Sequence, residues 1–549
     1  MAETQHGLEL YFQPFSALEY RTDVPILCIV FEDQPDLILT KAFPEVEALR
    51  LRFDMMDKHG EETVTLFNVV RGQSIIPLAI IYIRNPWRRQ RNAEKWNVDN
   101  INFYREVWER TYFAANHLRM HKYDKAVFVL PSRFQPDNIK RDRLQERRLE
   151  KFVRTLAEAI TAANHHLLDE FKQRKDPRLS AVTLTFFGEG GREVDEFFRR
   201  SMREGQAIGE AMGYTRRLIQ LPPNHKYPVR LAEQATGAKL RTVKSSSKSW
   251  HKVSEHGFSS QTTVSYLYGT EGIGKFGMGL VAAVGKGSEH QPLFLKTHYR
   301  PKTDREKKVK KVVIIGKGVT YDTGGLSLKS NADQENIHYD MGGAATALGV
   351  LKLADALGLP VEIVVLTPLV ENAIGHAATR RHDIVKAYNG KTVEIIDPDA
   401  EGRLIMADAI AYSERHLRAD CTVTLSTLCA MGDLGPDLLK IGMGNGRLEK
   451  KVKRAEWDSC EKMLLLPRVE HFNWVDNEHV GDVSDLLQEP GSVYYHTAPF
   501  VFLSDFFAYA EPEWVFVDVS AIFETDADNY AAGPGFGLKF VWHLVKQLA

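Results

Sequence analysis

The sequence is poor in cysteine. Its 549 residues include only four, and no two have the spacing of a CxxC pair: Cys28, Cys421, Cys429 and Cys460. So few and so scattered thiols exclude a disulfide framework and favour a reducing compartment. We interpret each cysteine as a small buried hydrophobic residue.

Long apolar runs and an excess of one charge are also missing. No apolar run reaches the roughly 18 residues of a membrane-spanning helix. The 71 Lys and Arg residues nearly balance 72 Asp and Glu residues, which gives no support for general attraction to nucleic acid or membranes. The stretch MAETQHGLELYFQPF lacks the basic region and apolar core of a secretory signal. We therefore expect a soluble, cytoplasmic protein that binds neither membranes nor nucleic acid.

Several familiar catalytic motifs are absent. The sequence has no HExxH and no GxSxG. The stretch GTEGIGKF (269–276) approaches a phosphate-binding loop, but Phe276 stands where a hydroxyl is needed for Mg²⁺. These absences argue against a zincin, an α/β-hydrolase and a P-loop nucleotidase.

The remaining pattern is that of an α/β protein of at least two domains. Residues 1–192 combine amphipathic helices at 100–119 and 145–171 with apolar strands, expected at 24–31, 63–70, 75–83, 125–130 and 179–187. A connecting helix and linker occupy 193–228, and the helix is expected to end at Pro222-Pro223. A larger α/β domain follows at 229–549, with strands at 312–316, 361–370, 422–428 and 514–520 and a helix at 342–357.

Acidic side chains crowd the stretch VEIIDPDAEGRLIMADAIAY (393–412), directly after an apolar run. Asp397, Asp399 and Glu401 occupy every second position, and Arg403 keeps the same spacing. In an extended chain all four side chains point to one face. Because one arginine does not neutralise three carboxylates, the pattern predicts additional positive charge here.

A second polar segment, GKGVTYDTGGLSLK (316–329), also follows a buried strand, where sites of α/β folds usually lie. It carries Lys317, Asp322 and Lys329. The stretch DMGGAA then supplies Asp340 just before a predicted helix, which it could simply cap.

Four of the carboxylates in these segments could converge: Asp322, Asp340, Asp399 and Glu401. If these converge, neutralising them takes about two divalent cations, and hard oxygen ligands suit Zn²⁺, Mn²⁺ or Mg²⁺. Two metals bridged by carboxylates are a common device for activating water. A lysine beside such cations has a lowered pKa and can act as a neutral ligand. The open alternative is a structural cluster of salt bridges.

The segments resemble the leucyl aminopeptidase (cytosol aminopeptidase) family of two-metal exopeptidases. Three motifs carry the resemblance, in the order and spacing of the family: GKGVTYDTGGLSLK, DMGGAA and NGKTVEIIDPDAEGRLIMADA. It covers residues 210–549, and the YDTGGLS variant looks closest to the probable aminopeptidase-like branch. The resemblance implies that 229–549 is a catalytic domain with a mixed central sheet flanked by helices.

The resemblance also implies a metal-binding role for five residues. Lys317 and Asp340 are expected to bind the tighter metal, and Asp399 the more exchangeable one. Asp322 and Glu401 are expected to bridge both. The cofactors implied are two divalent ions, Zn²⁺ and/or Mn²⁺.

Two further residues are implied to be catalytic. Lys329 is expected to polarise the scissile carbonyl and stabilise the oxyanion, and Arg403 to hold a bicarbonate ion that accepts a proton. The implied reaction removes a neutral or apolar N-terminal residue from a peptide, with a hydroxide between the metals attacking the carbonyl. The substrate's free amine binds one metal, and the family is typically a homo-hexamer.

The sequence departs from the family at some positions. Asp397 and Pro398 replace Asn and Thr, which adds an acid near the metals. Thr427 replaces a glycine and is expected to narrow the pocket for the first side chain. Ile337 and Leu425 are the other residues expected at that pocket.

Two other functions remain open. One is a non-catalytic oligomeric scaffold or a nucleic-acid-binding relative, against which the intact Lys329 and Arg403 argue. The other is a two-metal phosphoesterase, which favours histidine ligands that neither segment supplies.

Overall fold

The computed structural model describes residues 8–12, 24–31, 66–71, 74–83, 101–130, 143–165, 171–173, 177–186, 192–241, 249–302, 309–429, 438–467, 480–485, 492–508, 512–523 and 534–548. The chain forms two compact units, Met1–Gly213 and Tyr214–Ala549. The division falls within helix α6 (Arg192–Gln220). The boundaries at 192 and 229 stay a prediction.

The first unit contains a six-stranded sheet in the order β1-β6-β5-β2-β4-β3. Its strands are β1 (Glu9–Phe12), β2 (Ile26–Phe31), β3 (Leu66–Arg71), β4 (Ser74–Ile83), β5 (Lys125–Leu130) and β6 (Ala181–Phe186). All pairs are parallel except the β3–β4 hairpin. Five strands match the prediction, whereas β1 was missed because four residues carry too short a pattern.

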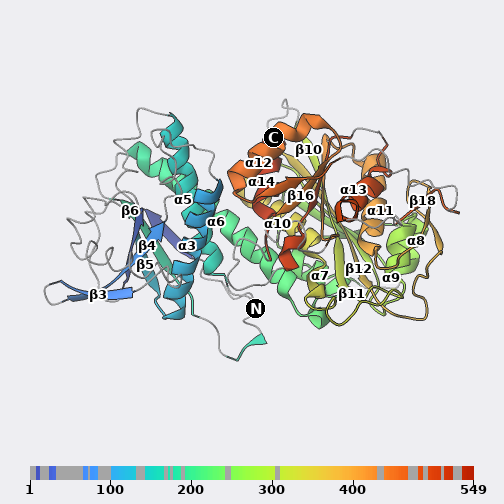
Figure 1. Cartoon of the computed structure of the whole chain (residues 1–549), viewed down its shortest axis with the longest axis horizontal. Coiled ribbons are helices and arrows are strands. Elements are labelled where there is room, and N and C mark those ends of the chain that lie inside the picture. Colours follow the sequence, from blue (N-terminus) through green and yellow to red (C-terminus); the bar gives the residue numbers. More distant parts are fainter. Residues whose placement is uncertain are drawn as a thin grey trace. The chain divides into compact units, whose positions relative to one another are not determined.

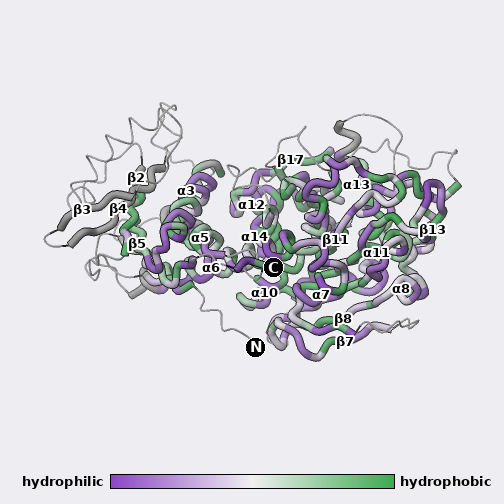
Figure 2. Tube along the Cα trace, turned by 90° about the horizontal axis from the view of Figure 1, so that it is seen from below, coloured by the Kyte–Doolittle hydropathy of each residue, from purple (hydrophilic) through white to green (hydrophobic). Residues whose placement is uncertain are grey.

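Two long helices of this unit, α3 (Ile101–Met120) and α5 (Arg143–Ala163), pack against each other. Figure 2 shows β5 as a mostly hydrophobic stretch and α3 as one with many hydrophilic residues. The helix predicted at 145–171 ends early, at Ala163. Asn164 follows it, and its side chain hydrogen-bonds both backbone groups of Leu179 just before β6.

The second unit is built on a mixed ten-stranded sheet, which confirms the predicted fold class. Nine of its strands lie in the order β17-β16-β19-β15-β10-β12-β9-β8-β7, and the tenth, β11, pairs with β12. The strands are β7 (His251–Val253), β8 (Thr262–Tyr268), β9 (Leu293–Tyr299), β10 (Lys311–Gly316), β11 (Gly318–Asp322), β12 (Glu362–Asn372), β15 (Cys421–Ser426), β16 (Leu439–Met443), β17 (Met463–Leu465) and β19 (Trp514–Asp518). A small separate sheet holds β13 (Ile384–Lys386), β14 (Thr392–Glu394) and β18 (Val483–Ser484).

Helices flank the large sheet on both faces (Figure 1). Those on one side are α10 (Gly342–Leu357), α12 (Glu449–Ser459) and α14 (Leu538–Leu548), and those on the other are α8 (Thr270–Phe276), α9 (Gly279–Gly285), α11 (Glu401–His416) and α13 (Ser492–Ser504). Helix α7 (Pro228–Thr236) packs near β9, β11 and β12, and short 3₁₀ turns complete the unit: η6 (Pro223–His225), η7 (Ile337–Tyr339), η8 (Gly446–Leu448) and η9 (Ser520–Phe523). In the described part of the chain, no helix has both the length and the apolar character needed to cross a bilayer.

The strands at the centre of the sheet determine where the polar residues that follow them lie. Strands β10 and β15 are parallel neighbours, with Gly316 opposite Leu425. Both strands are almost fully buried, as their unbroken apolar and threonine sequences predict. Their carboxyl ends therefore meet at one edge, and the residues that follow them are brought together there.

Candidate metal centre

The ends of several elements carry the candidate residues. Lys317 follows β10, Asp322 ends β11, and Asp340 follows η7. Glu401 begins α11, and Thr427 follows β15. Segments far apart in the sequence thus supply one group of polar side chains, as the two motifs predicted.

Lys317, Asp340 and Glu401 form the buried half of this group. Its Nζ lies 2.9 Å from Asp340 Oδ1 and 2.9 Å from Glu401 Oε1. It also donates a hydrogen bond to the carbonyl oxygen of Thr427 at 2.8 Å. Asp340 does not cap α10: the residue before that helix is Met341, and no side chain caps it. The capping interpretation of Asp340 was therefore wrong.

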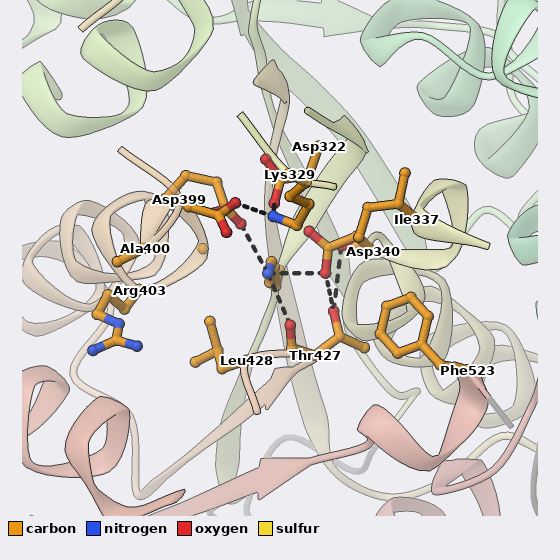
Figure 3. Close-up of a pocket in the computed structure, with 13 residues that line it drawn as sticks. Asp322, Lys329, Ile337, Asp340, Asp399, Ala400, Arg403, Thr427, Leu428 and Phe523 are labelled. Carbon is orange, nitrogen blue, oxygen red and sulfur yellow. Dashed lines mark hydrogen bonds and ion pairs between the residues drawn. The ribbon is translucent and has the colours of Figure 1, made fainter. Parts of the chain in front are cut away.

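Lys329 forms a second, more open half. Its Nζ pairs with Asp322 Oδ2 and with Asp399 Oδ1. Asp322 Oδ1 accepts hydrogen bonds from the Gly324 amide at 2.9 Å and from Asn372 Nδ2 at 2.8 Å. Figure 3 shows the carboxylates of Asp322, Asp340 and Asp399 turned toward the middle of the group.

Glycines allow this packing at two positions. A Cβ on Gly402 would lie 2.4 Å from Cε of Lys317, so any other residue would displace the lysine. Gly324 has a φ of 83° in the turn before Lys329, and a Cβ there would lie 2.3 Å from the carbonyl oxygen of Ser327. The AEGR and DTGG motifs therefore contain glycine for steric reasons.

Burial and mutual repulsion perturb the titration of the cluster. Burial, then Glu401, raises the pKa of Asp322 to about 6, and burial holds the pKa of Asp340 well above its usual value. Burial also raises the pKa of Glu401, but Lys317 and Lys329 outweigh it and leave that pKa lowered. Burial lowers the pKa of Lys317, yet the nearby carboxylates outweigh it and raise that pKa overall. Protons held here are therefore released when a cation binds.

Arg403 is buried beside the cluster. Its Nη1 donates to the carbonyl oxygen of Asp485 at 2.9 Å, and its Nε has no hydrogen-bond partner within the described residues. The Asp485 carboxylate accepts the Ile396 amide at 2.6 Å and so supports the acidic segment. The sequence analysis did not predict this role for Asp485, which lies in the stretch GDVSDL (481–486).

Asp397 does not share the face of the other acids. Its Oδ1 lies 3.4 Å from Nη2 of Arg381, which also donates to Ser327 Oγ at 3.1 Å. It also accepts the Asp399 amide at 3.2 Å. The extended spacing does not hold, because β14 ends at Glu394 and the chain turns after Asp397, whose carbonyl oxygen accepts the Ala400 amide at 2.9 Å. The extra acid is thus turned away and paired with an arginine.

The cluster lines a cavity of about 110 Å³. The residues around it are Lys317, Asp322, Lys329, Ile337, Asp340, Asp399, Ala400, Glu401, Gly402, Arg403, Thr427, Leu428 and Phe523. Leu425 does not line it; this residue is buried in β15, where its carbonyl accepts the Lys317 amide at 2.9 Å. Leu428 and Phe523 were not predicted, and Phe523 comes from η9, where no sequence motif marked it.

The side chains present suit divalent cations. Four carboxylates and three basic groups line the cavity. Oxygens of Asp322, Asp340 and Glu401 lie within 4.8 Å of one another. Asp340 Oδ2 is buried without a hydrogen-bond partner among the described residues, which leaves this oxygen available to bind a cation. Clustered anionic oxygens are the donors that hard divalent ions prefer.

Solved structures share the fold. Tomato leucine aminopeptidase, in a mutant form, has a TM-score of 0.75 and 20% identity, covering 100% of this chain and 98% of that one. A structure described as "Bottromycin maturation enzyme BotP in complex with Mn" has a TM-score of 0.70 and 22% identity, covering 96% of this chain and 100% of that one. At such identities the likeness shows the fold alone.

Sequence comparison shows the family as well as the fold. A "Probable cytosol aminopeptidase" of Azoarcus sp. is 32% identical over 355 residues, which are 60% of this chain and 64% of that relative. The chain thus matches slightly less than two thirds of that relative's length. The profile described as "Cytosol aminopeptidase family, catalytic domain" matches residues 213–542, more than half of the chain. The chain therefore belongs to the cytosol aminopeptidase family.

Proposed function

We propose that the protein is a metal-dependent aminopeptidase that removes a neutral or apolar first residue from peptides. The observation that carries the proposal is the convergence of Lys317, Lys329 and four carboxylates on one cavity from separate segments. Membership of the cytosol aminopeptidase family supports it. A purely structural salt-bridge cluster does not explain why Asp340 Oδ2 is buried without a hydrogen-bond partner in the described part of the chain.

Five side chains would hold two divalent ions. Lys317, Asp340 and Glu401 pair in the buried half, and Asp322 and Asp399 pair with Lys329 in the open half. Asp322 and Glu401 would each contact both ions, since their carboxylate oxygens lie within 4.8 Å of one another. When bound, such ions polarise a carbonyl and lower the pKa of water. We propose Zn²⁺ or Mn²⁺; the BotP structure described with Mn supports the second.

The protein's own groups complete the reaction. Lys329, on the open side of the cavity, stabilises the negative charge that develops on the scissile carbonyl oxygen. Arg403, whose Nε has no hydrogen-bond partner among the described residues, would hold a small anion such as bicarbonate that takes up a proton. Ile337, Leu428 and Phe523 give the cavity an apolar side, which suits a neutral first side chain.

Family membership also suggests how the protein is assembled. We propose a homo-hexamer working in the cytoplasm on peptides with a free N-terminus. The four scattered, buried cysteines agree with a reducing compartment.

A substrate panel tests the proposal. Leucine, alanine, phenylalanine and glutamate p-nitroanilides would be assayed after chelation and after addition of Mn²⁺, Zn²⁺ or Co²⁺. We expect chelation to abolish hydrolysis of the neutral substrates, and metal to restore it. N-acetyl-leucine p-nitroanilide is the matched control and should not be cleaved. Chelator-resistant hydrolysis, or none on any free-amine substrate, would contradict the proposal.

A further inference from the structure

Thr427 touches both residues of the buried half. Its hydroxyl donates to Asp340 Oδ1 at 2.8 Å. Its carbonyl oxygen accepts from Lys317 Nζ at 2.8 Å. The residue is itself buried, 4% exposed, and lines the cavity. One residue at the end of β15 thus contacts the amine and the carboxylate that we assign to the same metal.

The two oxygens of Asp340 have different surroundings. Oδ1 receives the Thr427 hydroxyl and lies 2.9 Å from Lys317 Nζ. Oδ2 is buried without a hydrogen-bond partner among the described residues. In Figure 3 this second oxygen lies on the side of Asp322 and Lys329. The hydroxyl therefore fixes the carboxylate by one oxygen and leaves the other available.

Thr427 is held firmly enough to do this. Its backbone follows β15, which is paired on both sides with β10 and β19. A Cβ on Gly342, at the start of α10, would lie 3.6 Å from Cγ2 of Thr427, so the methyl group packs against that helix end. A threonine placed in this way has little freedom to rotate its hydroxyl away from Asp340.

We propose that Thr427 is a positioning residue that orients Asp340 and thereby tightens the buried metal site of this chain. Partners of this kind fix the direction of a metal ligand and typically change metal affinity by about 10–100-fold. Where the related motif has glycine, no side-chain hydroxyl is available. The proposal rests on the proposed function, since it needs a metal at Asp340.

Paired variants test it. Thr427→Val keeps the shape and removes the hydroxyl, whereas Thr427→Ser keeps the hydroxyl and removes the methyl group. Binding of Mn²⁺ and Zn²⁺ to chelated protein would be followed by titration calorimetry. We expect Thr427→Val to weaken one of two sites by about 10–100-fold and to leave the other unchanged. Thr427→Ser should retain most of the wild-type affinity.

Controls separate this effect from general damage. Thr236→Val removes another buried hydroxyl, which donates to the Ala232 carbonyl in α7, and should leave both metal sites unchanged. Thermal unfolding of the chelated variants reports the fold without metal. Equal affinity in Thr427→Val and wild type, equal loss in the valine and serine variants, or weakening of both sites together would overturn the role of Thr427. If wild-type protein binds no metal, the proposed function fails as well.

Discussion

The two lysine-centred halves of the site differ in their exposure to solvent. In the first, the side chains of Lys317, Asp340 and Glu401 are 4%, 3% and 2% exposed. In the second, Asp322 is also only 3% exposed, but Lys329 is 13% and Asp399 29% exposed. The same pairing of an ammonium group with two carboxylates thus occurs once in the interior and once at an opening. Charges attract more strongly away from water. The first half is therefore suited to stabilising the fold and retaining a cation, and the second to exchanging a cation and contacting a substrate.

Glu401 offers the strongest test because it couples the halves. It lies 2.9 Å from Lys317 Nζ, and both Lys317 and Lys329 lower its pKa. We expect Glu401→Ala to lose both bound metals and all measurable turnover, as determined by elemental analysis and the p-nitroanilide assay. Glu449→Ala, on the partly exposed start of α12, is the control and should change neither. A full complement of two metals in Glu401→Ala would contradict its place between the ions.

Lys317→Met tests the buried half through stability. The change leaves two buried carboxylates without their cation, which typically costs about 3–5 kcal/mol. We expect that loss in the free energy of unfolding by urea, measured with chelator present. The metal content of the variant should also fall to one ion. An unchanged free energy of unfolding would mean that the buried half does not depend on its ammonium group.

Lys329→Met is the matched change in the open half. Losing one donor to an oxyanion costs about 3–4 kcal/mol, or roughly 10²–10³-fold in turnover. We expect that fall in kcat with both metals retained, and a smaller loss of unfolding free energy than in Lys317→Met. If Lys329→Met loses metal while Lys317→Met keeps it, the two lysines have the opposite roles.

Asp397→Asn should have the smallest effect. The Asp397 side chain is 25% exposed, and it pairs at 3.4 Å with Arg381, which is 56% exposed. Pairs of this kind contribute up to about 1 kcal/mol. We therefore expect kcat and the amount of metal bound per chain each to change by less than a factor of about five. Arg381→Gln and the double variant complete a cycle, in which a coupling above about 1 kcal/mol would show that the pair supports the site.

The convergence of the candidate residues on one cavity was predictable because their motifs are local. Lys317 follows the buried strand β10, Asp322 ends β11, and Glu401 lies within an unbroken acidic motif. The orientation of Asp397 was not predictable from spacing, because a two-residue period holds only while the chain remains extended. The chain turns after Asp397, and α11 begins at Glu401.

Other features depend on distant parts of the chain. Phe523 reaches the cavity from η9, and Asp485 supports Arg403 from beyond β18. Neither placement follows from the residues beside it in the sequence. Strand β1 has only four residues, and its place is set by pairing with β6. Such contacts are decided by tertiary packing and not by local pattern.

The spread of the cavity walls along the sequence affects how the protein is made. Lys317 and Thr427 are 110 residues apart, and the wall formed by Phe523 is synthesised later still. A nascent chain that ends before this residue has no complete cavity, although its earlier strands are already outside the ribosome. The candidate metal ligands and basic groups of the cavity are therefore synthesised before the apolar wall to which Phe523 contributes.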